Sequence, residues 1–126
     1  MNRVNIEHVN YTVTDPDKTA DLMCRLFDWK VRWAGEAVND GRAVHVGTDD
    51  FYLALYAPSK TIRVEVHDYL QRGGLNHVGV VVEDLDATEA RVLAEGLETY
   101  FHADYEPGKR FYFSDHDAIE YEVVSY

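Results

Sequence analysis

Hydrophobic positions along the chain divide it into two helix-like segments and several short strand-like segments. After Asp15-Pro16, and again after Asp84, apolar side chains recur every three or four residues, which predicts helices with one buried face. Each aspartate can cap the free N–H groups of its helix, Pro16 suits a first helical turn, and Gly96 is predicted to end the second helix. The predicted buried faces are Thr19, Leu22, Met23, Leu26 and Phe27, then Leu85, Thr88, Val92 and Leu93.

Segments rich in β-branched and aromatic residues follow each helix, and Gly, Asp, Asn and Pro clusters separate them. They predict strands at residues 29–33, 43–46 and 52–56 after the first helix. After the second helix they predict strands at residues 98–102, 110–113 and 119–124.

The two halves of the chain repeat one another. A shift of 69 positions superposes residues 6–15 on 75–84, so that His8 falls on His77 and Asp15 on Asp84. Each copy has the order β-α-β-β-β. We therefore expect an α+β fold of two tandem modules that form a curved mixed sheet around a central cavity. The expected organisation is one domain, 1–126, with module 1 at 4–57, a linker at 58–73 and module 2 at 74–126.

Composition and charge narrow the range of partners. Hydrophobic residues make up 46% of the 126, which is typical of a globular protein, and no apolar run approaches the roughly 20 residues of a transmembrane helix. The net charge is -11, and most of the excess lies after residue 63. Such a field repels nucleic acid and anionic lipid, so we expect neither as a partner. The short apolar runs lead us to expect a cytoplasmic protein.

The candidate chemistry lies in the opening strands and the last strand. His8 and His77 hold equivalent positions, so a pseudo-twofold arrangement of the modules would bring both to the central cavity. In the last strand Glu120 and Glu122 share a face, and Glu122 can join the histidines. A lone histidine in a strand usually packs or faces solvent, and it is the repeat that favours a metal site. Two histidines and one carboxylate leave coordination positions open for Lewis-acid or oxygen chemistry on Fe(II), Mn(II) or Zn(II).

These residues resemble the vicinal oxygen chelate superfamily of glyoxalases, bleomycin resistance proteins and extradiol dioxygenases. The resemblance is carried by Ile6-Glu7-His8-Val9, by residues 75–82 around His77, and by residues 110–117 leading to Glu122. It implies that His8, His77 and Glu122 are the metal ligands and that the substrate is a small molecule binding through oxygen atoms. It also implies a homodimer.

Within the superfamily, the residues favour one subclass and leave others open. The resemblance to glyoxalase I would imply four metal ligands, with a carboxylate in the closing strand of both modules. This chain has Ala54 at that position of the first module. Tyr112 lies ten residues before Glu122, a spacing similar to that of the active-site tyrosine of extradiol dioxygenases. We therefore prefer a dioxygenase-like enzyme, with Tyr112 and Glu120 as candidates for proton transfer. A metal-dependent thiol transferase, lyase or epimerase remains an alternative.

A second hypothesis is a metal-free binding protein of the bleomycin-resistance type, which would sequester a planar molecule on aromatic side chains. Aromatic residues make up 13% of the chain, although most aromatic side chains fill cores. The predicted pocket residues are Trp29, Trp33, His45, Tyr52 and Tyr56.

Overall fold

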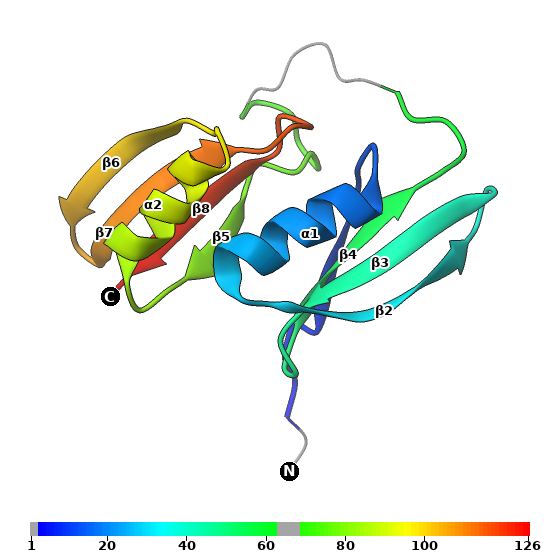
Figure 1. Ribbon diagram of the computed structural model, residues 1–126, viewed down its shortest axis with the longest axis horizontal. Coiled ribbons are helices and arrows are strands. Elements are labelled where there is room, and N and C mark those ends of the chain that lie inside the picture. The colour runs from blue at the N-terminus through cyan, green and yellow to red at the C-terminus, as the bar shows by residue number, and fades with distance from the viewer. Residues whose placement is uncertain (1–2, 63–68) are drawn as a thin grey trace. The chain divides into compact units, whose positions relative to one another are not determined.

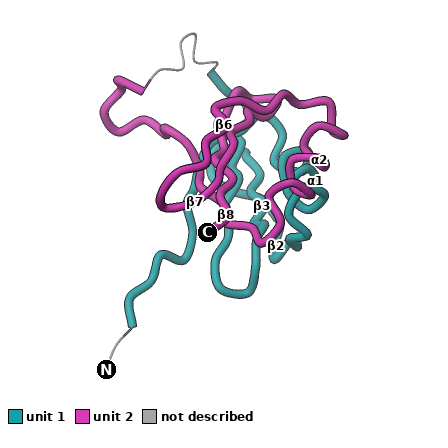
Figure 2. Tube along the Cα trace, turned by 90° about the vertical axis from the view of Figure 1, so that its left-hand side faces the viewer, with its two compact units in different colours: residues 1–63 teal, residues 64–126 magenta. Residues whose placement is uncertain are grey.

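The computed structural model describes residues 3–62 and 69–126, and the chain divides into two compact units, Met1–Arg63 and Val64–Tyr126 (Figure 2). The predicted linker 58–73 includes residues 63–68, which lie outside the described residues, so its extent stays a prediction. Each unit consists of one helix and a four-stranded mixed sheet (Figure 1). This arrangement confirms the α+β class and the two tandem β-α-β-β-β modules, and neither sheet closes into a barrel.

Unit 1 contains β1 (His8–Thr12), α1 (Pro16–Phe27), β2 (Lys30–Ala37), β3 (Gly41–Gly47) and β4 (Tyr52–Ala57). The strands lie in the order β1-β4-β3-β2, with β1 parallel to β4 and the other pairs antiparallel. β2 continues past its predicted end at Trp33, because it pairs with β3 as far as Ala37 opposite Gly41.

Unit 2 repeats this plan with β5 (Val78–Val81), α2 (Leu85–Ala94), β6 (Thr99–Tyr105), β7 (Gly108–Ser114) and β8 (Glu120–Ser125). Its strand order, β5-β8-β7-β6, matches that of unit 1, and β5 is parallel to β8. The repeat read from the sequence is thus a structural repeat.

Both helices begin where their capping aspartates predict. The side chain of Asp15 accepts a hydrogen bond from the Lys18 N–H at 3.2 Å, and that of Asp84 accepts one from the Ala87 N–H at 3.0 Å. α2 ends at Ala94, and Gly96 then adopts a positive φ of 81°, which glycine tolerates without a steric cost. Neither helix of the described ranges is long and apolar enough to cross a bilayer.

Strand alternation gives the sheet of unit 2 two different faces. The face toward α2 is apolar and buries Phe111, Phe113, Tyr121 and Val123 completely. Burial of side chains of this size stabilises a fold by roughly 1.5–3 kcal/mol each. The opposite face therefore receives the intervening residues of β7 and β8, which include Arg110, Tyr112, Glu120 and Glu122. This polar face carries the candidate site.

Candidate functional site

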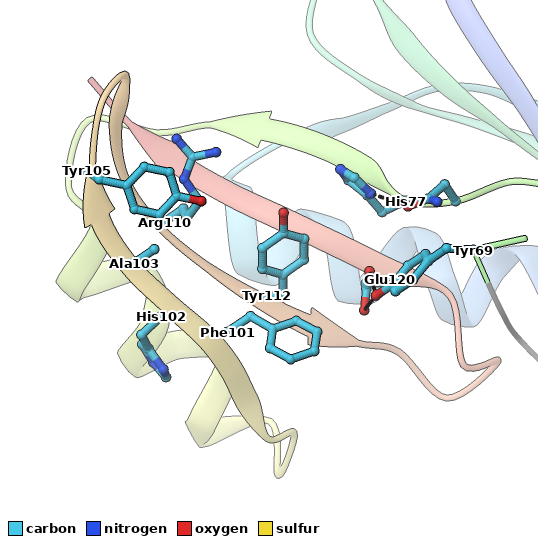
Figure 3. A pocket seen from close by; sticks show the side chains of 10 residues that line it. Tyr69, His77, Phe101, His102, Ala103, Tyr105, Arg110, Tyr112 and Glu120 are labelled. Atoms are coloured by element: carbon cyan, nitrogen blue, oxygen red, sulfur yellow. Dashed lines mark hydrogen bonds between the residues drawn. The ribbon is translucent and has the colours of Figure 1, made fainter.

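A pocket of about 510 Å³ lies on the polar face of unit 2 (Figure 3). Tyrosine and phenylalanine supply four of its ten lining residues, and one arginine, two histidines and one carboxylate are among the others. The lining residues are Tyr69, Asn76, His77, Phe101, His102, Ala103, Tyr105, Arg110, Tyr112 and Glu120.

Glu122, a predicted metal ligand, sits beside this pocket with its side chain only 15% exposed. Its Oε2 accepts hydrogen bonds from Arg110 Nη1 and from the Tyr112 hydroxyl, both at 2.9 Å. Its other oxygen, Oε1, lies 3.6 Å from His77 Nε2. The carboxylate thus has one oxygen held by protein donors and the other facing an imidazole nitrogen.

Both predicted histidine ligands are oriented by the residue before them. His77 precedes β5 and its Nδ1 lies 2.7 Å from Asn76 Oδ1, while His8 begins β1 with its Nδ1 2.9 Å from Glu7 Oε1. Because these oxygens accept hydrogen bonds, the contacts favour the neutral tautomer of each ring that has its proton on Nδ1. Nε2 then keeps a lone pair, which is the arrangement that metal-binding histidines use.

The residues of unit 2 fit a divalent metal in donor chemistry. His77 Nε2 and Glu122 Oε1 offer one nitrogen and one oxygen, the ligand types that Fe(II), Mn(II) and Zn(II) accept. His8 belongs to unit 1, and no group of three His, Cys, Asp or Glu side chains arranged for a metal occurs within residues 3–62 and 69–126. The structure therefore brings together two of the three predicted ligands, and the third ligand remains a prediction.

Tyr112 is a hydrogen-bond donor in the pocket. Burial and the hydrogen bond to Glu122 raise its pKa to about 12, so the hydroxyl keeps its proton at neutral pH. Arg110 lies over the ring of Tyr105, with its Cζ 5.2 Å from the ring centroid. Its Nε is buried and has no hydrogen-bond partner among the described residues. The ring face partly compensates this buried cation.

Glu120, predicted as a proton-transfer residue, is 5% exposed and is held by two tyrosines. Tyr69 donates to its carboxylate at 2.7 Å and Tyr100 donates to it at 2.8 Å. The hydrogen bond to Glu120 raises the pKa of Tyr69 to about 12. Glu120 is therefore an acceptor that lines the pocket beneath a phenol (Figure 3).

Unit 1 brings together three of the five predicted pocket residues. Tyr52 stacks between His8 and His45, with ring centroids 5.0 and 4.5 Å away, and Trp33 lies 5.0 Å from His45. Arg32 covers the Tyr52 ring at 4.5 Å. Burial lowers the pKa of His45, which favours its neutral form. These residues form a cluster around the predicted ligand His8.

The other two predicted pocket residues lie apart from this cluster. Trp29 packs on Phe27 and Phe51, with ring centroids 4.9 and 6.0 Å away. The Tyr56 hydroxyl donates to the Val38 carbonyl at 2.9 Å, which ties β4 to the turn after β2. Both side chains have local structural contacts.

The sequence reasoning did not single out several residues of the unit 2 pocket: Tyr69, Phe101, Tyr105 and Arg110. Arg110 had a usable signal, because it lies two residues before Tyr112 in the same strand and must share its face. Phe101 had none, since it follows Tyr100 directly and regular alternation would place the two on opposite faces.

Solved structures with the same fold include proteins of different activities. A glyoxylase/bleomycin resistance protein/dioxygenase domain from Frankia sp. EAN1pec is 23% identical, with 98% of each chain covered and a TM-score of 0.82. The fosfomycin resistance protein FosX from Listeria monocytogenes, complexed with Mn(II) and sulfate, is 16% identical, with 97% of this chain and 92% of that chain covered and a TM-score of 0.75. TnmS3, an antibiotic binding protein from Streptomyces sp. CB03234, is 18% identical, with 99% and 98% covered and a TM-score of 0.72. At these identities the likeness shows a shared fold.

The family comparison covers nearly the whole chain. The model of the Glyoxalase/Bleomycin resistance protein/Dioxygenase superfamily matches residues 5–123. No match was found among curated proteins. The resemblance inferred from the His8, His77 and Glu122 segments is confirmed at this level, and the chain belongs to the Glyoxalase/Bleomycin resistance protein/Dioxygenase superfamily.

Proposed function

We propose that this protein is a divalent-metal-dependent enzyme acting on a small substrate that binds through two oxygen atoms. The observation that carries the proposal is the pairing of His77 Nε2 with Glu122 Oε1 at 3.6 Å, with the Nδ1 of His77 held by Asn76. His77, Glu122 and His8 would hold Fe(II), Mn(II) or Zn(II). A metal bound there would act as a Lewis acid toward the substrate oxygens.

The surrounding residues supply binding and proton transfer. The Tyr112 hydroxyl, which keeps its proton, would turn its hydrogen bond from Glu122 Oε2 to a substrate oxygen as that oxygen gains negative charge. Glu120 would accept a proton through the Tyr69 hydroxyl that covers it, and the aromatic walls would exclude water. These roles favour a dioxygenase-like reaction on a phenolic or enolizable substrate.

A thiol transferase acting on a phosphonate is less favoured by the charges of the pocket. Such a substrate needs several cations, whereas Arg110 is the only Lys or Arg among the lining residues and is paired with Glu122. The neighbouring cation, Lys109, pairs with Asp104 at 3.8 Å. A lyase or epimerase would use the same metal and remains the alternative within this class.

The second candidate is a metal-free protein that sequesters an aromatic molecule. The ion pair between Arg110 and Glu122 favours it, because the arginine already neutralises the carboxylate that a metal would need. The aromatic rings of Phe101, Tyr105 and Tyr112, which line the pocket, would hold a planar ligand without a metal.

Elemental analysis of protein purified without chelators or affinity metals separates the two. We expect near-stoichiometric metal in the wild type, lost in both His77→Ala and Glu122→Ala. His116→Ala and Glu83→Ala, which replace the same residue types outside the pocket lining, should keep the metal. Wild-type protein that contains no metal and takes up no Fe(II), Mn(II) or Zn(II) would leave the sequestering protein as the better account. A homodimer, also proposed here, is tested by sedimentation of the same samples.

A further inference from the structure

The strand β6 contains a bulge at the wall of the pocket. Tyr100 pairs with Tyr112 and Ala103 pairs with Arg110, so that Phe101 and His102 together oppose Phe111. Phe101 has a φ of 52°, in the left-handed region. A bulge with two residues against one and a left-handed first residue normally has glycine at that position. Here a large aromatic residue occupies it.

The bulge sends its two side chains in opposite directions. Phe101 lies on the pocket side, near Tyr112 (Figure 3). Its ring is edge-to-face with those of Tyr100 and Tyr112, whose centroids are 4.9 and 5.7 Å away. His102 points away from Tyr112 (Figure 3). Its Nε2 lies 2.6 Å from Oε2 of Glu89 in α2. The contact with Glu89 fixes the bulge, and the bulge places Phe101 beside Tyr100 on one face.

Folding alone does not account for phenylalanine at this position. Phe101 is 63% exposed, so its ring gains little from burial, while its left-handed backbone is strained for any residue with a Cβ. Glycine would remove the strain and lose few contacts. A strained residue that holds an exposed aromatic ring at the wall of a pocket points to a ligand that covers the ring.

We propose that Phe101 is a specificity-determining residue whose ring stacks on a planar aromatic ring of the substrate. The inference rests on the proposed function and deepens it, because it narrows the oxygen-bearing substrate to an aromatic one. The pocket volume of about 510 Å³ suits one small aromatic molecule, and Tyr105 and Tyr112 provide further ring surface. Aromatic rings that meet in this way attract one another beyond their buried area.

The test compares two oxygen chelators that differ in having a ring. Isothermal titration calorimetry under anaerobic conditions would measure the Kd of Mn(II)-loaded protein for 4-nitrocatechol, a planar aromatic diol, and for acetohydroxamic acid, which has no ring. The variants are Phe101→Gly and Phe101→Leu. The control is Ala118→Gly, because Ala118 is exposed, has a φ of 61° and does not line the pocket.

We expect Phe101→Gly to weaken the binding of 4-nitrocatechol roughly tenfold, the size of one aromatic pair contact. Its Kd for acetohydroxamic acid should stay within about twofold of wild type, since no ring contact is lost. Phe101→Leu should also bind 4-nitrocatechol more weakly, because it lacks a flat ring. The Tm of Phe101→Gly and that of Ala118→Gly should each equal or exceed the Tm of wild type, because glycine relieves the left-handed backbone. The control Ala118→Gly should bind both probes with wild-type affinity.

The proposal is overturned if Phe101→Gly binds 4-nitrocatechol with wild-type affinity, or if it loses affinity equally for both probes. It is also overturned if the sedimentation coefficient of Phe101→Gly differs from that of wild type, which would show that Phe101 holds a protein contact instead. If the wild type binds no Mn(II), the metal proposal fails separately. The role of Phe101 is then read from 4-nitrocatechol titrated into metal-free protein, where the same ratio is expected. Absence of binding to wild type in both states also overturns it.

Discussion

Replacing Arg110 with methionine should destabilise the metal-free protein and strengthen its binding of a divalent metal. The substitution keeps an apolar stem against Tyr105 and removes the charge that pairs with Glu122 at 2.9 Å. The side chains of Arg110 and Glu122 are only 14% and 15% exposed, so the pair is largely shielded from water.

The expected loss of stability follows from what remains around Glu122. Removing one partner of a buried ion pair costs about 3–5 kcal/mol when the other charge is left without compensation. Here the Tyr112 hydroxyl still donates to the same oxygen, and the substitution also removes the buried Nε that has no partner among the described residues. Both effects reduce the cost to about 2–3 kcal/mol, which lowers the Tm of a domain of this size by roughly 10 °C.

The metal dependence of this loss makes the test specific. Arg110 and a bound metal both neutralise Glu122, so a metal should restore much of the stability of Arg110→Met and bind to it about tenfold or more tightly than to wild type. Thermal melts followed by circular dichroism, with and without Mn(II), measure the first effect, and calorimetric titration of Mn(II) measures the second.

A matched control lies next to Arg110 in the sequence. Lys109→Met removes a cation whose contact with Asp104, at 3.8 Å, is largely exposed, and it should change neither the Tm nor the Mn(II) affinity measurably. An Arg110→Met protein that has the wild-type Tm in the absence of metal, or that binds Mn(II) more weakly than wild type, would contradict this prediction.

Two further predictions concern elements outside the pocket. Arg42 donates to both carboxylate oxygens of Asp17, at 2.7 and 2.9 Å, and this hydrogen bonding holds the pKa of Asp17 below its ordinary value. The stabilisation is therefore complete above the ordinary pKa of about 3.9 and is lost as the pH falls through the folded-state pKa, so the Tm values of wild type and Arg42→Gln should converge in acid. A gap that persists at the lowest accessible pH would contradict this. Asp84→Ala should lower the free energy of unfolding by about 1 kcal/mol in urea titrations, because it removes the N-cap bond to Ala87, whereas Asp84→Asn keeps an acceptor and should stay close to wild type.

The sequence was sufficient for those features that depend on neighbouring residues or on repetition. Asp15 and Asp84 mark helix starts, because a capping side chain contacts N–H groups only three residues ahead. The 69-residue repeat predicted two modules of one plan, and both sheets have the same strand order. Alternation in β8 placed Glu120 and Glu122 on one face, which the structure supports by linking both to pocket residues.

Tertiary structure determined which side chains from different strands meet on these faces. Glu122 meets Arg110, Tyr112 and His77 because β8 pairs with both β7 and β5, and the register of those pairings is set by turns and core packing. A bulge in β6 brings Phe101 into the pocket. Such a bulge normally has glycine at its left-handed position, but here that residue is Phe101, so the local sequence does not predict the bulge. Local hydrogen bonds and periodicity can be read along a chain, whereas the contacts of a site join strands that are distant in sequence, and those contacts depend on the whole fold.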